Sequence, residues 1–184
     1  MKSKAEIRKE VSDRIKALTP GKRAAAERRL GISFAVFLRR SFRPGDLVMG
    51  YCPLPDEPDI TPVLELLLES GYRLCLPVIT PHNGMVAREV TDLKTDLLTN
   101  HWHIREPSAF CPEAVPLDIR LVIVPGRAFT PGGARLGRGK GFYDRFLPRT
   151  PARRVALAYQ CQIYAEDELP VEEHDARLHE IFRA

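Results

Sequence analysis

The hydrophobic positions near the beginning of the chain predict two helices. Apolar side chains recur there every three or four positions, at Ile7, Val11, Ile15 and Leu18. This spacing is typical of the buried face of a helix. Thr19 followed by Pro20 indicates an N-cap and a first-turn proline, so a second helix is expected to begin there. Its basic C-terminal end, residues 39–40, leads into a predicted turn at 43–46.

Continuous apolar runs farther along the chain predict buried strands. The clearest are residues 47–51, 74–78, 121–125 and 154–159, with weaker candidates at 85–90 and 178–182. A helix is expected to open at Thr61–Pro62 and to end at Gly71. Apolar strands that alternate with helices indicate an α/β fold whose mainly parallel sheet is covered on both faces. Because the sequence shows no repeat and no linker that divides it, we expect residues 1–184 to form one domain.

Composition narrows the classes of protein that the chain can represent. The 184 residues are 44% hydrophobic and 28% charged, with a net charge of +4. This mild positive charge suits a small anionic ligand at least as well as nucleic acid. The four cysteines form no C-x-x-C pair, which argues against a structural zinc site. Neither a signal peptide nor an apolar run long enough to cross a membrane is present, so we expect a cytoplasmic protein without a membrane partner.

The most informative segment is residues 135–145, with the sequence RLGRGKGFYDR. Its glycines alternate with Arg138 and Lys140, and Asp144 follows. Glycine lets backbone N–H groups approach a ligand closely, and the cations neutralise phosphate charge. A carboxylate at the end of such a loop could hold the magnesium that accompanies a nucleoside triphosphate. The pattern therefore favours a phosphate-binding loop.

Other interpretations of this loop remain open. It is not a Walker A loop, because Lys140 is followed by Gly141 rather than by Ser or Thr, and its G-x-G-x-G spacing differs from the dinucleotide fingerprint. A basic glycine-rich loop can also be a mobile surface or an RNA contact. Residues 140–142 begin like an RNA-recognition signature, but the positions that follow diverge from it.

Several other candidate residues each have an ordinary structural interpretation beside the functional one. The acidic residues 56–59 can interact with the dipole of the helix that follows, or Glu57 can bind the amino group of a heterocycle. Trp102, between two histidines, can belong to the core or form the wall of a ligand site. Asp175 can lie in a surface loop or bind a metal. Because Glu57, the glycine-rich loop and Gln160 all follow strand ends, we expect them to converge on one cleft.

Taken together, these segments resemble the 5-formyltetrahydrofolate cyclo-ligase family, also called 5,10-methenyltetrahydrofolate synthetases. The strongest part of the resemblance is DIRLVIVPGRAF at 118–129, continuing into the loop at 135–145. The supporting segments are K-x-x-x-R at 4–8, YCPLPDE at 51–57, WHIREP at 102–107 and LPVEEHD at 169–175.

The resemblance implies a three-layer α/β/α, Rossmann-like fold with the N-terminal helices packed on the central sheet. It implies an enzyme that uses ATP and Mg²⁺ to convert 5-formyltetrahydrofolate to 5,10-methenyltetrahydrofolate, releasing ADP and phosphate. Its partners would be the folate substrate and ATP, without nucleic acid, and it would be a monomer or a small homo-oligomer.

The resemblance also implies roles for individual residues. The ATP-binding residues would be Lys4, Arg8, Arg135, Leu136, Gly137, Arg138, Gly139, Lys140, Gly141, Phe142 and Tyr143. Lys140, Arg138 and Tyr143 would take part in catalysis. The folate-binding residues would be Leu54, Glu57, Met85, Trp102 and Tyr143, and the magnesium ligands would be Asp144 and Asp175.

The chain departs from the family pattern at three places. Residues 57–60 read EPDI where the family usually has EVDT, Phe142 replaces a more common tyrosine, and Thr130 stands where aspartate is common. We expect activity to survive the change at Phe142 because the ring is kept. The alternatives are a family member that uses ATP on a different formyl or pterin-like substrate, or a basic RNA-binding module.

Overall fold

The computed structural model describes residues 2–81, 84–100, 104–170, 172 and 175–184. Its helices are α1 (Lys4–Lys16), α2 (Pro20–Ser41), α3 (Thr61–Glu69) and α4 (Phe142–Phe146), with 3₁₀ turns η2 (Pro116–Asp118), η3 (Leu147–Arg149) and η4 (Gln160–Gln162). Its strands are β1 (Leu47–Met49), β2 (Arg73–Thr80), β3 (Gly84–Val90), β4 (Leu97–Thr99), β5 (Arg105–Pro107), β6 (Ile119–Ile123), β7 (Ala128–Phe129), β8 (Arg135–Leu136), β9 (Arg153–Ala158) and β10 (Glu180–Arg183).

The second helix begins where the sequence predicts, and the first, whose start the hydrophobic pattern did not locate, begins at a capping serine. The side chain of Ser3 accepts a hydrogen bond from the Glu6 backbone N–H and forms a capping box at the start of α1. The side chain of Thr19 caps α2 by accepting from the Lys22 N–H, and Pro20 occupies the first turn. Each of these caps joins residues within one stretch of four, so caps of this kind can be recognised in the sequence.

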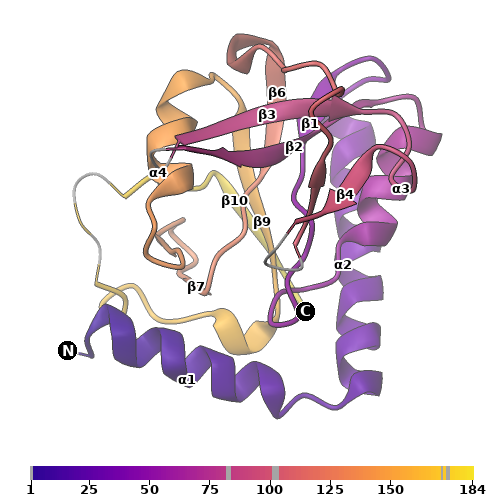
Figure 1. Ribbon diagram of the computed structural model, residues 1–184. Coiled ribbons are helices and arrows are strands. Elements are labelled where there is room, and N and C mark those ends of the chain that lie inside the picture. The colour runs from indigo at the N-terminus through magenta and orange to yellow at the C-terminus, as the bar shows by residue number, and fades with distance from the viewer. Residues whose placement is uncertain (1, 82–83, 101–103, 171, 173–174) are drawn as a thin grey trace.

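A six-stranded sheet in the order β10-β9-β6-β1-β2-β3 forms the centre of the molecule (Figure 1). Every neighbouring pair is parallel except β2 and β3. Residues 81–83 are too few to hold the crossover that a parallel pair needs, so β3 returns antiparallel at the edge. The mainly parallel α/β fold is confirmed, and the ambiguous segment 178–182 contributes the other edge strand, β10.

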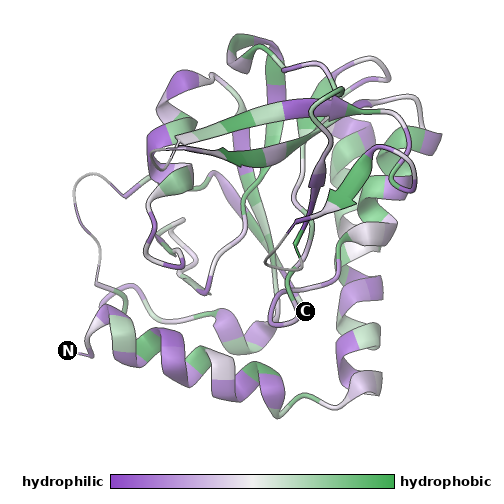
Figure 2. Ribbon diagram, viewed as in Figure 1, coloured by the Kyte–Doolittle hydropathy of each residue, from purple (hydrophilic) through white to green (hydrophobic). Residues whose placement is uncertain are grey.

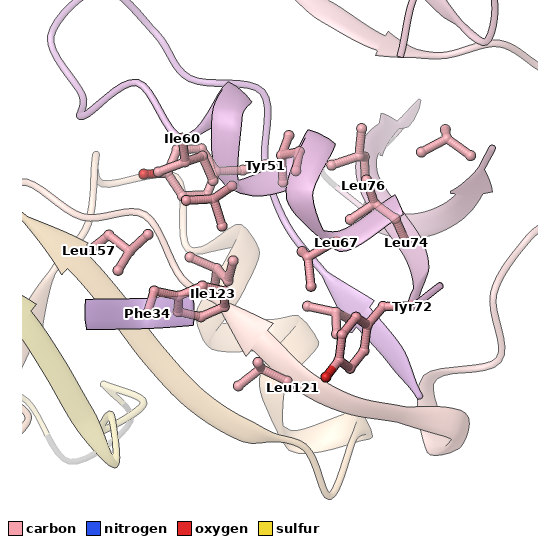
Figure 3. Packing of buried hydrophobic residues seen from close by; sticks show 14 of the residues in the cluster. Phe34, Tyr51, Ile60, Leu67, Tyr72, Leu74, Leu76, Leu121, Ile123 and Leu157 are labelled. Carbon is pink, nitrogen blue, oxygen red and sulfur yellow. The ribbon is translucent and has the colours of Figure 1, made fainter. Parts of the chain in front are cut away.

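One face of the sheet is covered by α2 and α3. Phe34 of α2 and Leu67 of α3 are fully buried against Leu74 of β2, Leu121 of β6 and Leu157 of β9, as the close-up in Figure 3 shows. Burial of these side chains removes apolar surface from water, which is the main force that holds the layers together. Figure 2 shows the difference in hydropathy between these elements and α1: hydrophobic residues predominate in α3, whereas hydrophobic and hydrophilic residues alternate along α1.

The opposite face of the sheet is covered by α4, η3 and the segment that leads to them. Met49 of β1 and Val122 of β6 point to this side, where they cluster with Phe146 and Leu147. Their neighbours along the strands, such as Val48, point to the first face. Because both faces are buried, the strands read as continuous rather than alternating apolar runs.

The N-terminal helix α1 occupies a different position from α2. Its buried residues Ile7 and Val11 pack with Leu136 of β8 and with Tyr159, which directly follows β9. It therefore crosses the carboxyl end of the parallel strands and covers the hairpin of β7 and β8, rather than a face of the main sheet (Figure 1). Among the described residues, no helix is long and apolar enough to cross a membrane.

Candidate active site

The glycine-rich loop connects β8 to α4 near the carboxyl ends of the central strands. Arg135 and Leu136 form β8, which pairs with β7, and α4 begins at Phe142. Gly139 and Gly141 have positive φ angles of 93° and 67°. Other residues rarely adopt this conformation, so the tight path of the loop depends on glycine at these two positions.

A cavity of about 100 Å³ lies against this loop. It is lined by Glu57, Pro125, Gly126, Arg135, Gly137, Arg138, Gly139, Lys140, Gly141, Phe142, Tyr143 and Asp144. The structure thus brings the candidate phosphate-binding loop, one candidate metal ligand and the candidate folate ligand Glu57 to one cavity. Leu136 is the exception within the loop, because its side chain packs in the cluster under α1.

Arg135 is a buried cation at the base of this cavity. Its Nη2 donates to Asp144 Oδ1 at 2.6 Å, and its Nη1 donates to the Pro125 carbonyl at 3.1 Å. Its Nε finds no hydrogen-bond acceptor in the described part of the chain. The guanidinium carbon lies 5.8 Å from the centre of the Tyr143 ring. Arg135 is therefore held in place beside the cavity and still has donor capacity.

Tyr143 also lines this cavity, and its hydroxyl is buried. Within the described residues this hydroxyl has no hydrogen-bond partner. Burial raises the pKa of Tyr143 well above its ordinary value, so the phenol stays protonated and can donate a hydrogen bond. A buried polar atom without a partner is unusual in a folded protein and indicates a position that a ligand can satisfy.

Glu57 joins this cavity to a second, larger one. Its side chain is 5% exposed; Oε1 accepts from Arg138 Nε at 3.0 Å and Oε2 from the Leu54 backbone N–H at 3.0 Å. Burial raises the pKa of Glu57, and the charge of Arg138 only partly offsets this effect. The carboxylate of Glu57 is thus desolvated and partly neutralised by a residue of the glycine-rich loop.

Asp56, next to Glu57, is bound from two sides. It forms an ion pair with buried Arg127 at 2.6 Å and a second ion pair with Arg138. Burial favours a higher pKa for Asp56, but the hydrogen bond and charge of Arg138 and the charge of Arg127 outweigh it and lower the pKa. Arg138 therefore ties the loop at 137–141 to both carboxylates of the segment that follows β1.

The larger cavity, here called the outer pocket, has a volume of about 410 Å³. It is lined by Arg23, Cys52, Pro53, Leu54, Pro55, Glu57, Asp59, Thr61, Leu64, Leu93, Leu97, Ile104 and Arg105. Its mostly apolar wall with a buried carboxylate at one side fits a flat heterocycle that carries N–H donors. Leu54 and Glu57, two of the candidate folate-binding residues, lie in this wall.

Two other candidate folate residues, Met85 and Trp102, are not among the residues that line the outer pocket in the described part of the chain. Met85 of β3 is buried in the cluster under the sheet, against which Phe142 and Tyr143 also pack. Trp102 lies outside the residues that the structure describes. Gln160, expected to join the cleft, is exposed; the buried side chain of Gln162 instead donates to the Gly126 and Arg127 carbonyls.

The N-terminal cations reach the loop and the C-terminal segment, although they are far from both in sequence. Arg8 Nε donates to the Gly137 carbonyl at 2.9 Å. Lys4 Nζ lies 3.0 Å from Asp175 Oδ2 and 2.9 Å from Glu172 Oε1. Burial disfavours the charged amine, but these carboxylates outweigh it and raise the pKa of Lys4.

The segments that carry the two candidate magnesium ligands are in contact. The backbone N–H of Ala176, next to Asp175, donates to Asp144 Oδ1 at 3.4 Å. Across the described ranges no group of three or more His, Cys, Asp or Glu side chains could by itself hold a metal ion. Two carboxylates nonetheless fit Mg²⁺, which usually takes one or two protein carboxylates and completes its shell with phosphate oxygens and water.

Two residues near the site were not assigned a role from the sequence. Arg127 lies two residues after the apolar run 121–125, and a charged residue so close to the end of a buried strand is a detectable signal. Arg23 is one of several basic residues in α2, so the sequence offered no reason to single it out. Only the tertiary structure places its side chain at the outer pocket.

Comparison with known proteins agrees with this geometry. The model of the 5-formyltetrahydrofolate cyclo-ligase family matches residues 1–184. A 5-formyltetrahydrofolate cyclo-ligase of Mycolicibacterium smegmatis is 33% identical over 138 residues, covering 73% of this chain and 71% of the relative. The enzyme of the same name from Escherichia coli K12 is 35% identical over 127 residues, covering 66% and 69%.

Solved structures show the same likeness. The 5,10-methenyltetrahydrofolate synthetase of Aquifex aeolicus superposes with a TM-score of 0.80 at 31% identity, over 98% of this chain and 89% of that one. The synthetase of Mycoplasma pneumoniae has a TM-score of 0.78 at 19% identity, covering 98% of each chain, which supports the fold alone. With a match along its whole length and relatives above 30% identity, the chain belongs to the 5-formyltetrahydrofolate cyclo-ligase family.

Proposed function

We propose that this chain catalyses the ATP-dependent conversion of 5-formyltetrahydrofolate to 5,10-methenyltetrahydrofolate, with release of ADP and phosphate. Family membership supports this assignment, and one structural observation carries it. Glu57 lines both the outer pocket and the cavity at the glycine-rich loop, and it binds Arg138 of that loop. A carboxylate suited to a pterin and a cation suited to a phosphate therefore meet at one point, as a phosphoryl transfer to a folate requires.

The reaction has two steps. The formyl oxygen attacks the γ-phosphorus of ATP, and the bond to the bridging oxygen of ADP breaks. N10 of the folate then attacks the activated formyl carbon and loses its proton, the C–O bond breaks, and phosphate leaves with the former formyl oxygen. Enzymes accelerate such a transfer mainly by positioning the reactants and neutralising charge.

The nucleotide would lie along the glycine-rich loop, with Lys4 and Arg8 of α1 beside it. Arg135 and Tyr143 would donate hydrogen bonds to the nucleotide, because each has a buried polar atom without an acceptor in the described residues. Lys140 is exposed at the loop, and its ammonium group could swing onto the transferring phosphoryl group. Backbone N–H groups of the glycines would complete the binding site.

Asp144 and Asp175 would hold Mg²⁺, which would neutralise charge on the β- and γ-phosphates. Both carboxylates are paired with proposed ATP-binding cations, Asp144 with Arg135 and Asp175 with Lys4. Binding of the nucleotide with its metal would therefore exchange these internal ion pairs for contacts of each partner with the ligand. This exchange would let the site keep its charges solvated or paired at every stage.

The folate would occupy the outer pocket, with Glu57 accepting hydrogen bonds from the pterin and Leu54 in the apolar wall. Trp102 and Met85 remain proposals for the same ligand, and Tyr143 would lie between folate and nucleotide. Both substrates are small and water-soluble, and we place the reaction in the cytoplasm.

A spectroscopic assay tests the proposal. Purified protein with 5-formyltetrahydrofolate should produce the absorbance of the methenyl product only when ATP and Mg²⁺ are both present. ATP binding without this product would instead favour the alternative of a different formyl or pterin-like substrate. Absence of both turnover and ATP binding would reject the function proposed here.

A further inference from the structure

The segment that carries Glu57 is held from behind by two residues of α2. Arg23 Nη2 donates to the backbone carbonyls of Pro55, at 2.9 Å, and of Glu57, at 3.2 Å. Glu27, one helical turn later, accepts a hydrogen bond from the backbone N–H of Asp59 at 3.1 Å. Three backbone groups of residues 55–59 are therefore bound to one face of a long helix.

Tyr159 joins these two side chains. Arg23 Nε donates to the Tyr159 hydroxyl at 3.1 Å, and this hydroxyl donates to the carboxylate of Glu27. The guanidinium carbon of Arg23 also lies 5.7 Å from the centre of the Tyr159 ring. Since Tyr159 is fully buried directly after β9, the sheet itself fixes the orientation of Arg23.

We propose that Arg23 is a positioning residue that holds the backbone of residues 55–57 so that the Glu57 carboxylate stands between the outer pocket and the glycine-rich loop. The inference rests on the proposed function of that site. Although Arg23 also lines the outer pocket, its N–H groups bind the Tyr159 hydroxyl and backbone carbonyls of residues 55–57, so we assign it an action through Glu57, distinct from the contacts that Arg138 makes with the same segment.

The chemistry of the contacts explains why arginine suits this position. Its planar guanidinium presents several N–H donors in fixed directions, so one side chain can bind a hydroxyl and two carbonyl groups together. Lysine has a single ammonium group and can replace only part of this set. Displacement of a positioned group by as little as 1 Å can lower the rate by about 100-fold.

Enzyme kinetics with both substrates tests the proposal. Arg23→Met should lower kcat/KM for 5-formyltetrahydrofolate by about 10- to 100-fold, while KM for ATP stays within about 2-fold of the wild-type value. Arg23→Lys should recover part of the loss. Tyr159→Phe, which keeps the ring and removes the hydroxyl, should show a smaller loss with the same selectivity for folate.

Arg29→Met serves as the matched control, because Arg29 is exposed on the same helix. It should leave kcat and both KM values unchanged. The unfolding midpoint of each variant is measured in parallel with the kinetics. If Arg23→Met does not fold, the same comparison is made with Arg23→Lys and Tyr159→Phe.

Two results would overturn the inference: wild-type kcat/KM for folate in Arg23→Met, or parallel losses for folate and ATP that follow a lowered unfolding midpoint. Failure of the proposed function is a separate result, since it would appear as absence of turnover in the wild-type protein.

Discussion

At the scale of single residues, the neighbouring carboxylates Asp56 and Glu57 have opposite pKa shifts. Ion pairs with Arg127 and Arg138 outweigh burial at Asp56 and lower its pKa, whereas burial dominates at Glu57 and raises its pKa. Asp56 thus stabilises the folded chain in its charged form. Burial disfavours the charged form of Glu57, so this form costs stability, which is typical of a group retained for binding rather than for folding.

We therefore predict opposite effects of two isosteric substitutions. The folded chain binds the Glu57 proton above the ordinary pKa of 4.5, so the contribution of this group to stability falls as pH rises through that window. Glu57→Gln should be neutral or stabilising near pH 7, and this advantage should shrink toward about pH 4. Folate binding should nevertheless be lost.

Asp56→Asn should destabilise the chain at neutral pH by about 1–3 kcal/mol, because it leaves buried Arg127 without its charged partner. The unfolded chain binds the Asp56 proton more readily, so the loss should shrink as pH falls below the ordinary pKa of 3.8. Urea unfolding as a function of pH measures both effects, with exposed Glu65→Gln as the control. The same sign for both variants would contradict the assigned shifts.

Lys140 is the second residue for which the site makes a clear prediction. Lys140→Ala should lower the single-turnover rate by about 10²–10³-fold, a typical loss when one charge-stabilising group is removed. The unfolding midpoint should not change, because the side chain is exposed. Lys94→Ala, also exposed, should retain full activity. A near-wild-type single-turnover rate in Lys140→Ala would remove this residue from the mechanism.

At the scale of elements, the loop between β8 and α4 depends on backbone conformation as much as on charge. Its alternating glycines and cations were readable from the sequence, because glycine and positive charge are local properties. The partners of the loop were not. Arg8 of α1 and Glu57 after β1 reach it from segments more than seventy residues away. No local pattern encodes which distant carboxylate a given arginine will bind.

Gly139→Ala tests the conformational requirement. At φ = 93° a side chain is strained, and its Cβ would lie 3.2 Å from Arg8 Nη2. A residue forced into this region costs on the order of 1–3 kcal/mol, so we expect ATP affinity to fall by about tenfold or more. Isothermal titration with a non-hydrolysable ATP analogue measures the change.

Gly21→Ala is the matched control for this prediction. Gly21 lies in the first turn of α2, where a Cβ would meet nothing within 4 Å. The substitution should leave ATP affinity unchanged and stabilise the chain by about 0.4–1 kcal/mol, because alanine restricts the unfolded state. Equal ATP affinity in the two glycine variants would argue against a conformational role for Gly139.

At the scale of the whole molecule, the sheet and its two covering layers support a site built at one end. No described residue of the core under α2 and α3 lines the cavity at the glycine-rich loop, which is bounded by that loop and the start of α4. Leu64, Leu93 and Leu97 of this core also line the outer pocket, whereas Leu67 does not, so a substitution at Leu67 should change stability without changing catalysis. The carboxyl ends of the parallel strands point toward the site, as expected for an open α/β sheet.

Leu67→Ala tests this separation. Leu67 is fully buried between α3 and the sheet, so its truncation should cost about 2–5 kcal/mol of unfolding free energy. The kcat of the molecules that remain folded should stay at the wild-type value. Ile32→Ala, at a side chain that is 61% exposed on α2, should change neither quantity. A fall in kcat that matches the loss of stability would show that core and site are coupled.

The sequence by itself determined the starts of α2 and α3, the continuous apolar strands of the central sheet and the glycine-rich loop, because capping residues, prolines, apolar runs and glycine act over a few residues. It did not specify that β3 is antiparallel, that α1 crosses the strand ends, or that short hairpins form at β4–β5 and β7–β8. The tertiary structure also decided that Arg23, Glu57 and Arg138 meet. Such contacts follow from the packing of distant segments, which balances many weak interactions that no local pattern records.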